Sequence, residues 1–75
     1  MLINNAVAQT IRELRIKNNV SQEVLADAID SHQVYISEIE NGKKIPSIPI
    51  LYKISKFFGI SLSELTKLIE KKINQ

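Results

Sequence analysis

The sequence predicts an all-α fold, a compact domain of five short helices over residues 1–75. Turn-forming residues are scarce, since the chain contains 2 glycines and 2 prolines, too few for an all-β domain of 75 residues. Apolar residues recur at helical spacing, and residues that cap helices stand between the apolar stretches. With 44% hydrophobic residues and a formal net charge of +2, the composition fits a folded domain and excludes an acidic disordered chain.

The first predicted helix covers about residues 5–17, and its apolar positions at i, i+4 and i+7 are Val7, Ile11 and Leu14. Asn18 and Asn19 end this helix. Ser21 then stands at an N-cap position, so a short second helix begins at Gln22. The buried positions of this second helix are Leu25 and Ile29, with the small Ala26 between them.

The third predicted helix follows a break at residues 30–31 and runs from residue 32 or 33 to residue 40. It buries Ile36 and Ile39 on one side. Asn41 and Gly42 end it, because both residues tolerate the left-handed conformation found after a helix C-terminus. Residues 21–41 therefore predict a helix-turn-helix, in which Ala26 allows the two helices to cross closely.

The last two predicted helices have stronger start signals. Ser47 caps the fourth helix, Pro49 fits its first turn, and Gly59 ends it. Ser61 and Glu64 form a capping box that starts the fifth helix, which runs to about residue 72. The apolar stripes are Leu51, Ile54 and Phe58 in the fourth helix and Leu65, Leu68 and Ile69 in the fifth.

Composition excludes several function classes. There is no cysteine and a single histidine, His32, which we expect to cap the third helix or to lie exposed, so we expect no metal site. A Gly-rich phosphate loop and paired carboxylates beside a cleft are also missing, so the chain is not expected to be an enzyme or to hold a cofactor. No apolar run approaches the ~18 residues of a membrane span. We expect a cytoplasmic protein without a small-molecule ligand.

Four ordered motifs occur along the chain: residues 21–26 (SQEVLA), 35–43 (YISEIENGK), 46–47 (PS) and 58–65 (FGISLSEL). Together they resemble the Cro/CI (XRE) family of bacterial and phage DNA-binding domains, over about residues 8–70. The Tyr-Ile-Ser run and the small size also resemble the controller proteins of restriction–modification systems. The resemblance implies a lambda-repressor-like fold, binding to double-stranded DNA, and a third helix that enters the major groove.

The resemblance also implies which residues read bases. These are Gln33, Val34, Ser37 and Glu38, on the outer face of the third helix. Glutamine can bond adenine N6 and N7 together, and an exposed valine can pack on a thymine methyl. Glutamate can accept a hydrogen bond from cytosine N4 but repels phosphate. An ordinary exposed helix surface is the alternative for all four residues.

Other matched positions are implied to contact phosphate: Gln22, Tyr35, Asn41, Lys43 and Lys44. Tyr35 could instead be a packing residue, and the two lysines could be a solvated loop. Arg15 and Glu40 match an ion pair that joins the first helix to the third in many relatives. Breaking such a pair would leave an uncompensated charge.

Two features depart from the family pattern. Asp30 occupies a turn position that is often glycine, although aspartate tolerates the left-handed conformation. More importantly, no lysine or arginine lies between Lys17 and Lys43. Because basic residues supply most of the affinity for DNA, we expect modest affinity per protomer and a need for dimerisation.

The family binds as two-fold dimers on palindromic half-sites. The fifth helix, about residues 62–72, has more apolar residues than one small core needs, so Leu62, Leu65 and Ile69 are predicted to form the homodimer interface. Their alternative role is the core of the protomer itself.

The sequence therefore predicts a sequence-specific transcriptional regulator that binds as a homodimer and controls its own gene. The alternative is an antitoxin-type interaction module that binds a toxin partner and its own promoter.

Overall fold

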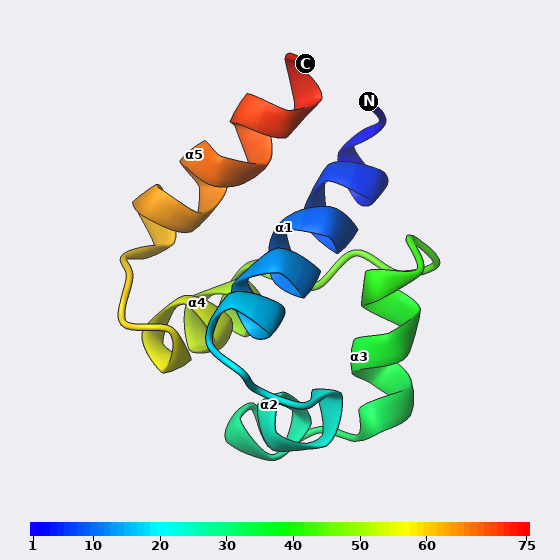
Figure 1. The fold of residues 1–75 in the computed structure, drawn as a ribbon, viewed down its shortest axis with the longest axis vertical. Helices are drawn as coiled ribbons and strands as arrows, with labels where there is room; N and C mark the ends of the chain where they lie inside the picture. Colours follow the sequence, from blue (N-terminus) through cyan, green and yellow to red (C-terminus); the bar gives the residue numbers. More distant parts are fainter.

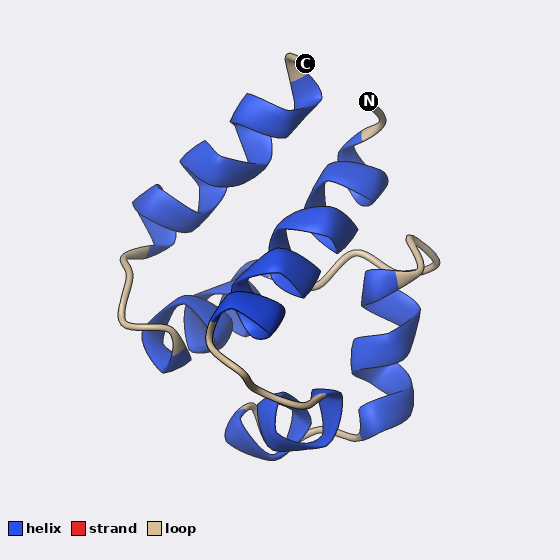
Figure 2. Cartoon of the chain, viewed as in Figure 1, coloured by secondary structure: helices blue, strands red, loops and turns tan.

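The computed structural model describes residues 1–75 as five helices joined by short loops, without strands (Figures 1 and 2). The helices are α1 (Ile3–Lys17), α2 (Gln22–Ala28), α3 (Gln33–Glu40), α4 (Ile48–Phe57) and α5 (Leu62–Ile73). The predicted all-α fold is confirmed, and the 5 helices occur in the predicted order. None of them is long and apolar enough to cross a membrane.

Serine residues cap three of the helices as the sequence predicts. The side chains of Ser21, Ser47 and Ser61 accept hydrogen bonds from backbone N–H groups three residues further on. The complete capping box forms at α5, where the Glu64 carboxylate accepts from the Ser61 N–H. By contrast, α1 begins at Ile3, before the predicted start, and its N-cap Leu2 makes no side-chain capping bond. His32 occupies the N-cap position of α3 and is exposed, and its side chain makes no capping bond.

The long helix α1 runs through the middle of the fold and contacts both α5 and α3 (Figure 1). α1 and α5 run in opposite directions, so the two chain termini lie at the same end of the molecule (Figure 1). α2 and α3 pack together at the other end. The fully buried large aliphatic residues come from all five helices and their caps: Ile11, Leu25, Ile29, Ile36, Ile39, Ile54 and Leu65.

The turn between α2 and α3 uses the conformation expected for it. Asp30 has a φ of 56°, in the left-handed region that aspartate tolerates better than most residues with a side chain. The loop after α3 also needs this conformation, and there Gly42 adopts a φ of 74°. A Cβ atom at Gly42 would lie 2.8 Å from Asn5 Oδ1, so the start of α1 packs closely against this loop.

Candidate nucleic-acid interface

The outer face of α3 borders an open hollow of about 430 Å³ beside the start of α2. The hollow is lined by 7 residues, of which 1 is hydrophobic. They are Gln22, Gln33, Val34, Ser37, Glu38, Asn41 and Lys43. All four residues predicted to read bases therefore lie together, with three of those predicted to contact phosphate. Tyr35 and Lys44 are outside the hollow.

Exposure differs along the face of α3. Gln33 and Val34 in the first turn are exposed, and Val34 has 70% of its surface accessible. Ser37 and Glu38, one turn further along, are half-buried. The first turn of α3 thus offers an amide and an apolar group to a partner, a pairing suited to the groove edge of an A·T base pair.

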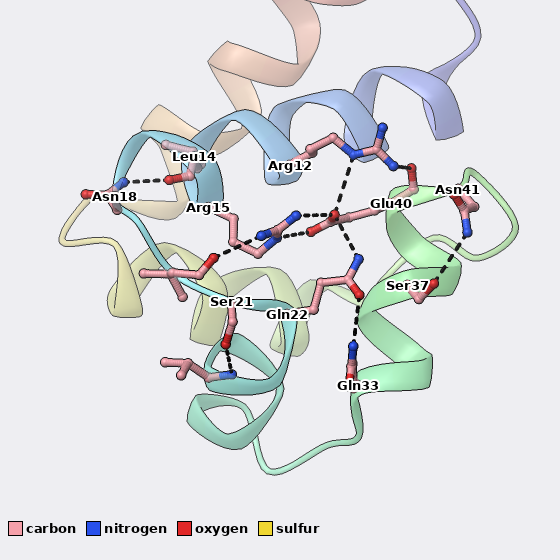
Figure 3. Close-up of polar contacts among 12 residues, drawn as sticks. Arg12, Leu14, Arg15, Asn18, Ser21, Gln22, Gln33, Ser37, Glu40 and Asn41 are labelled. Carbon is pink, nitrogen blue, oxygen red and sulfur yellow. Dashed lines mark hydrogen bonds and ion pairs between the residues drawn. The ribbon is translucent and has the colours of Figure 1, made fainter.

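A chain of hydrogen bonds links Gln33 to the interior of the domain (Figure 3). The Gln33 amide nitrogen lies 3.4 Å from Gln22 Oε1, and the Gln22 amide nitrogen donates to Glu40 Oε1 at 3.1 Å. Because the nitrogen of Gln22 must face the Glu40 carboxylate, its oxygen faces Gln33. The side-chain oxygen of Gln33 and one of its N–H groups remain available to a ligand. Gln22 therefore orients Gln33, in addition to the phosphate contact that the sequence predicts for it.

Glu40 is the centre of this network, and its side chain is 0% exposed. Arg15 and Glu40 form the ion pair that the resemblance implied. Arg15 Nε donates to Glu40 Oε2 at 2.8 Å and Arg15 Nη2 to Oε1 at 3.0 Å, which is a bidentate geometry (Figure 3). Arg15 also donates to the Val20 carbonyl oxygen at 2.9 Å. The pair therefore fixes α1, the loop before α2 and the end of α3 relative to one another.

The pKa of Glu40 reflects a competition between burial and its partners. Burial raises the pKa of the Glu40 carboxyl. Hydrogen bonds from Arg15 and Gln22, together with the positive charges of Arg15 and Arg12, lower the pKa by more than burial raises it. The pKa of Glu40 therefore lies below its ordinary value. The hydrogen bond to Glu40 raises the pKa of Arg15. Both groups are therefore charged near neutral pH, and the network keeps its ionic form.

The loop after α3 carries the basic residues nearest to the hollow. Lys44 Nζ lies 3.4 Å from Glu38 Oε1 and 5.9 Å from the centre of the Tyr35 ring, so Lys44 interacts with both residues. Glu38 is thereby partly neutralised, which weakens the repulsion of phosphate expected from its charge. Lys43 is exposed and has no acidic partner, which leaves its ammonium group available to a phosphate.

Two contacts at the interface were not predicted from the sequence. Arg12 donates to the backbone oxygen of Glu40 at 3.1 Å, and its Nε lies 3.5 Å from Glu40 Oε1. Asn4 donates to the backbone oxygen of Gly42 at 2.8 Å and ties the loop to α1. No sequence signal marks either contact, because each depends on how α1 crosses the end of α3.

The residues predicted to form the dimer interface pack on the core of their own protomer. Leu65 is 0% and Ile69 is 6% exposed, and both belong to the core of the protomer. Leu62 is half-buried and packs against the same core. Leu65 and Ile69 face inward because α5 packs against α1 and α4 with the side that carries them. Leu65 has no accessible surface left for a second protomer, and the predicted interface at Leu62 and Ile69 stays a prediction.

Two short helices joined by a tight turn, with the outer face of the second one exposed, define a helix-turn-helix DNA-binding domain. Comparison with known proteins agrees with this class. The helix-turn-helix family HTH_3 matches residues 11–65, and the chain belongs to this family. The family is a class of DNA-binding regulators and not a class of enzymes.

Two relatives are restriction–modification control proteins. Control protein C.BamHI of Bacillus amyloliquefaciens is 43% identical over 58 residues, which are 76% of this chain and 72% of the relative. Control protein C.MunI of a Mycoplasma species is 51% identical over 55 residues, which are 73% of this chain and 74% of the relative. The resemblance to controller proteins seen in the sequence is thus supported by two proteins of similar length.

Solved structures of the same fold cover nearly the whole chain. The clp gene regulator ClgR of Corynebacterium glutamicum matches with a TM-score of 0.90 at 24% identity, over 99% of this chain and 79% of that one. Controller protein C.Esp1396I, solved bound to a 25 base pair operator site, matches with a TM-score of 0.86 at 25% identity, over 100% and 99% of the two chains. The five-helix arrangement is therefore that of known regulators.

Proposed function

We propose that this chain is a sequence-specific transcriptional regulator of the controller type, which binds as a homodimer to a palindromic operator upstream of its own gene. The observation that carries the proposal is the hollow beside α3. It gathers the exposed amide of Gln33, the exposed apolar Val34 and the free ammonium group of Lys43 on one face. An amide and a methyl-binding group read bases, and a lysine at the border contacts phosphate.

The relatives support the regulatory part of the proposal. Two of them are named control proteins, and C.Esp1396I has been solved with its operator DNA. A regulator of this kind works on DNA, so we place the chain in the cytoplasm. The antitoxin alternative is not favoured, because the relatives are control proteins and transcriptional regulators.

A binding titration tests the proposal. The 75-residue chain is titrated into a fluorescent duplex taken from the DNA upstream of its own gene and, separately, into a scrambled duplex of equal composition. Each series is repeated at several salt concentrations between about 50 and 200 mM, because the logarithm of the affinity falls by about 0.9 per phosphate contact for each tenfold rise in salt. We expect preference for the upstream duplex and a steep salt dependence.

Equal and weak binding to both duplexes would refute sequence-specific regulation. The basic residues of this chain flank α3 and are absent from it, so non-specific binding alone should be weak and should disappear first as salt rises. Specific binding that persists at the higher salt concentration therefore separates base reading from charge attraction.

A further inference from the structure

A polar hollow of about 550 Å³ lies along α1, next to the hollow that borders α3. It is lined by 8 residues, of which 2 are hydrophobic, and they come from α1 and from the end of α3. We call this hollow the α1 cleft. Asn41 lines both hollows, so the α1 cleft continues the interface past the end of α3. Asn5, Arg12 and Asn41 are exposed in it and carry N–H donors.

The positive charge of the Glu40 network is concentrated on Arg12. Two guanidinium groups face the single carboxylate of Glu40, so one positive charge is in excess. Arg15 donates through Nε, Nη1 and Nη2 within the chain, and its side chain is 16% exposed. Arg12 donates through Nη2 to the Glu40 backbone oxygen, its Nη1 makes no hydrogen bond within the chain, and its side chain is 49% exposed. The excess charge therefore belongs to an accessible guanidinium group that is already held in place.

The acidic residues of the α1 cleft do not cancel this charge. Glu13 Oε1 accepts a hydrogen bond from Lys72 Nζ at 2.7 Å, and this bond lowers the pKa of Glu13. Glu13 is therefore charged, and Lys72 balances its charge. Arg15 balances Glu40 in the same way, through two hydrogen bonds. Arg12 thus gives the α1 cleft a net positive charge.

We infer that the α1 cleft binds a phosphate of the DNA backbone and that Arg12 is the main contact. The inference rests on the proposed function, because it concerns the same bound DNA. Arginine and amide side chains are among the groups that hold backbone phosphates in protein–DNA complexes. Arg12 supplies the N–H groups of its free Nη1, and Asn5 and Asn41 supply amide N–H groups in the same cleft.

The position of the α1 cleft matches the edge of the major groove. Recognition helices contact base edges with their N-terminal residues. α3 has 8 residues and is about 12 Å long at about 1.5 Å per residue, and the major groove is about 12 Å wide. When the first turn of α3 lies on the bases, the end of α3 therefore reaches the border of the groove, where the phosphates are. Arg12 lies at this end, because it donates to the Glu40 backbone oxygen (Figure 3).

Arg12 also prevents the end of α3 from repelling a phosphate. The C-terminus of a helix carries a partial negative charge on its last carbonyl groups. Arg12 donates to one of these groups, the Glu40 carbonyl, at 3.1 Å and places a cation beside it. Since no lysine or arginine lies between Lys17 and Lys43, this end of α3 has no cation of its own. Arg12 supplies that charge from α1.

Salt-dependent DNA titration of the Arg12→Met variant tests the inference. The upstream duplex and the scrambled duplex are both used, because a phosphate contact carries no sequence information. For each bound protomer, we expect Arg12→Met to lower the affinity for either duplex about tenfold at about 50 mM salt, the lower end for a hydrogen bond to a charged group. The salt slope should fall by about 0.9, so the difference should shrink to about threefold at about 200 mM salt.

Two further variants complete the design. Lys67→Met removes the same charge from an exposed position on α5, outside both hollows. It should stay within about twofold of wild type, because an exposed charge far from the contact is screened by salt. Arg12→Lys keeps the charge and should restore the salt slope, although lysine lacks the planar group that reaches Glu40 and a phosphate together. Circular dichroism shows whether each variant keeps its helices.

The outcomes separate this inference from the proposed function. Equal losses on the two duplexes support the Arg12 contact even if the wild-type chain prefers neither duplex, a result that refutes only sequence-specific regulation. An Arg12→Met variant that binds both duplexes like wild type overturns the contact, whatever preference the wild-type chain shows. Weaker binding with an unchanged salt slope also overturns it, because Arg12 then acts only by holding α3 in place.

A measurement on the wild-type chain does not depend on how a variant folds. The chain has 2 arginines, so the arginine Nε–H region of its NMR spectrum contains one signal from Arg12 and one from Arg15. The scrambled duplex should shift the Arg12 signal more than that of Arg15, whose donors are engaged within the chain. Inorganic phosphate at the same concentration of phosphate groups should shift it much less, because no second contact holds a free anion at the cleft. An unmoved Arg12 signal, or an equal response to inorganic phosphate, contradicts a site for the DNA backbone.

Discussion

Replacement of Arg15 by methionine tests whether the Glu40 network holds the recognition helix in place. The methionine keeps the apolar stem of the side chain and removes both hydrogen bonds to the Glu40 carboxylate, which are 2.8 and 3.0 Å long. Glu40, whose side chain is 0% exposed, keeps Gln22 at 3.1 Å and Arg12 at 3.5 Å as partners. Its charge then remains buried with much weaker compensation.

The expected loss is large for so small a chain. Removing one partner of a buried ion pair costs about 3–5 kcal/mol, and we expect the lower end, about 3 kcal/mol, because Arg12 and Gln22 stay in place. At 0.05–0.15 kcal/mol per residue, a chain of 75 residues has a total stability of about 4–11 kcal/mol. A loss of about 3 kcal/mol lowers the thermal midpoint by about 12–24 °C at about 4–8 °C for each kcal/mol.

The pH dependence distinguishes a lost charge partner from lost packing. In the wild-type chain the pKa of Glu40 is lowered, so this carboxylate contributes stability above its unfolded-state pKa and loses the contribution as pH falls through the folded-state pKa. In Arg15→Met, burial is no longer outweighed, and the pKa of Glu40 rises above its unfolded value. The cost of the buried charge is then present above the raised pKa and disappears as pH falls. The stability difference between the two proteins should shrink between about pH 7 and pH 4.

Urea denaturation followed by circular dichroism measures both effects, at one fixed protein concentration because dimerisation adds stability that depends on concentration. Arg12→Met is the matched control. Arg12 also faces Glu40, but its side chain is 49% exposed and its Nε lies 3.5 Å away, so we expect a loss below about 1 kcal/mol. An Arg15→Met loss that stays constant across the pH range, or one no larger than that of Arg12→Met, would refute the reasoning.

Three further predictions concern single side chains. Gln33→Ala should reduce the preference for operator over scrambled DNA by about 1–3 kcal/mol, the range for a bidentate base contact, and should not change the thermal midpoint. The control is Gln9→Ala, at an exposed glutamine on α1, which should change neither the preference nor the midpoint. Lys43→Ala should weaken binding to both duplexes alike and reduce the salt slope by about one unit, whereas Lys67→Ala on α5 should not. Ser61→Ala removes the 3.0 Å bond that caps α5 and should lower the thermal midpoint by about 4–8 °C for a loss of about 1 kcal/mol, with Ser63→Ala as the control. Unchanged duplex preference, an unchanged salt slope or an unchanged melting curve would contradict the three predictions in turn.

Local signals explain why the helices could be predicted from the sequence. A serine cap and the spacing of apolar residues are properties of neighbouring residues, and Ser21, Ser47 and Ser61 all cap the helices assigned to them. The same holds for Asp30, whose left-handed conformation follows from its place in a tight turn. The start of α1 was predicted too late because Leu2 provides no side-chain cap and leaves no mark in the sequence.

Contacts between helices set the limit of the sequence-based predictions. The resemblance pointed to Arg15 and Glu40, but the link from Glu40 through Gln22 to Gln33 depends on the angle between α2 and α3. The same limit applies to the predicted dimer residues on α5. An apolar stripe shows that a helix face is buried, but not whether its own domain or a partner buries it. Exposed apolar residues occur on α5, as at Leu68, but also on α1, on α4 and in the loop between α3 and α4.

The short loop of residues 41–47 holds Lys43 at the border of the hollow. Asn4 ties this loop to α1 through a hydrogen bond to the Gly42 carbonyl oxygen. Because no lysine or arginine lies between Lys17 and Lys43, each protomer has few phosphate contacts, and a second protomer doubles them. The Asn4 contact restricts the backbone next to Lys43, which lowers the entropy lost when this loop binds DNA. Dimer formation increases the affinity further, because it doubles the number of phosphate contacts.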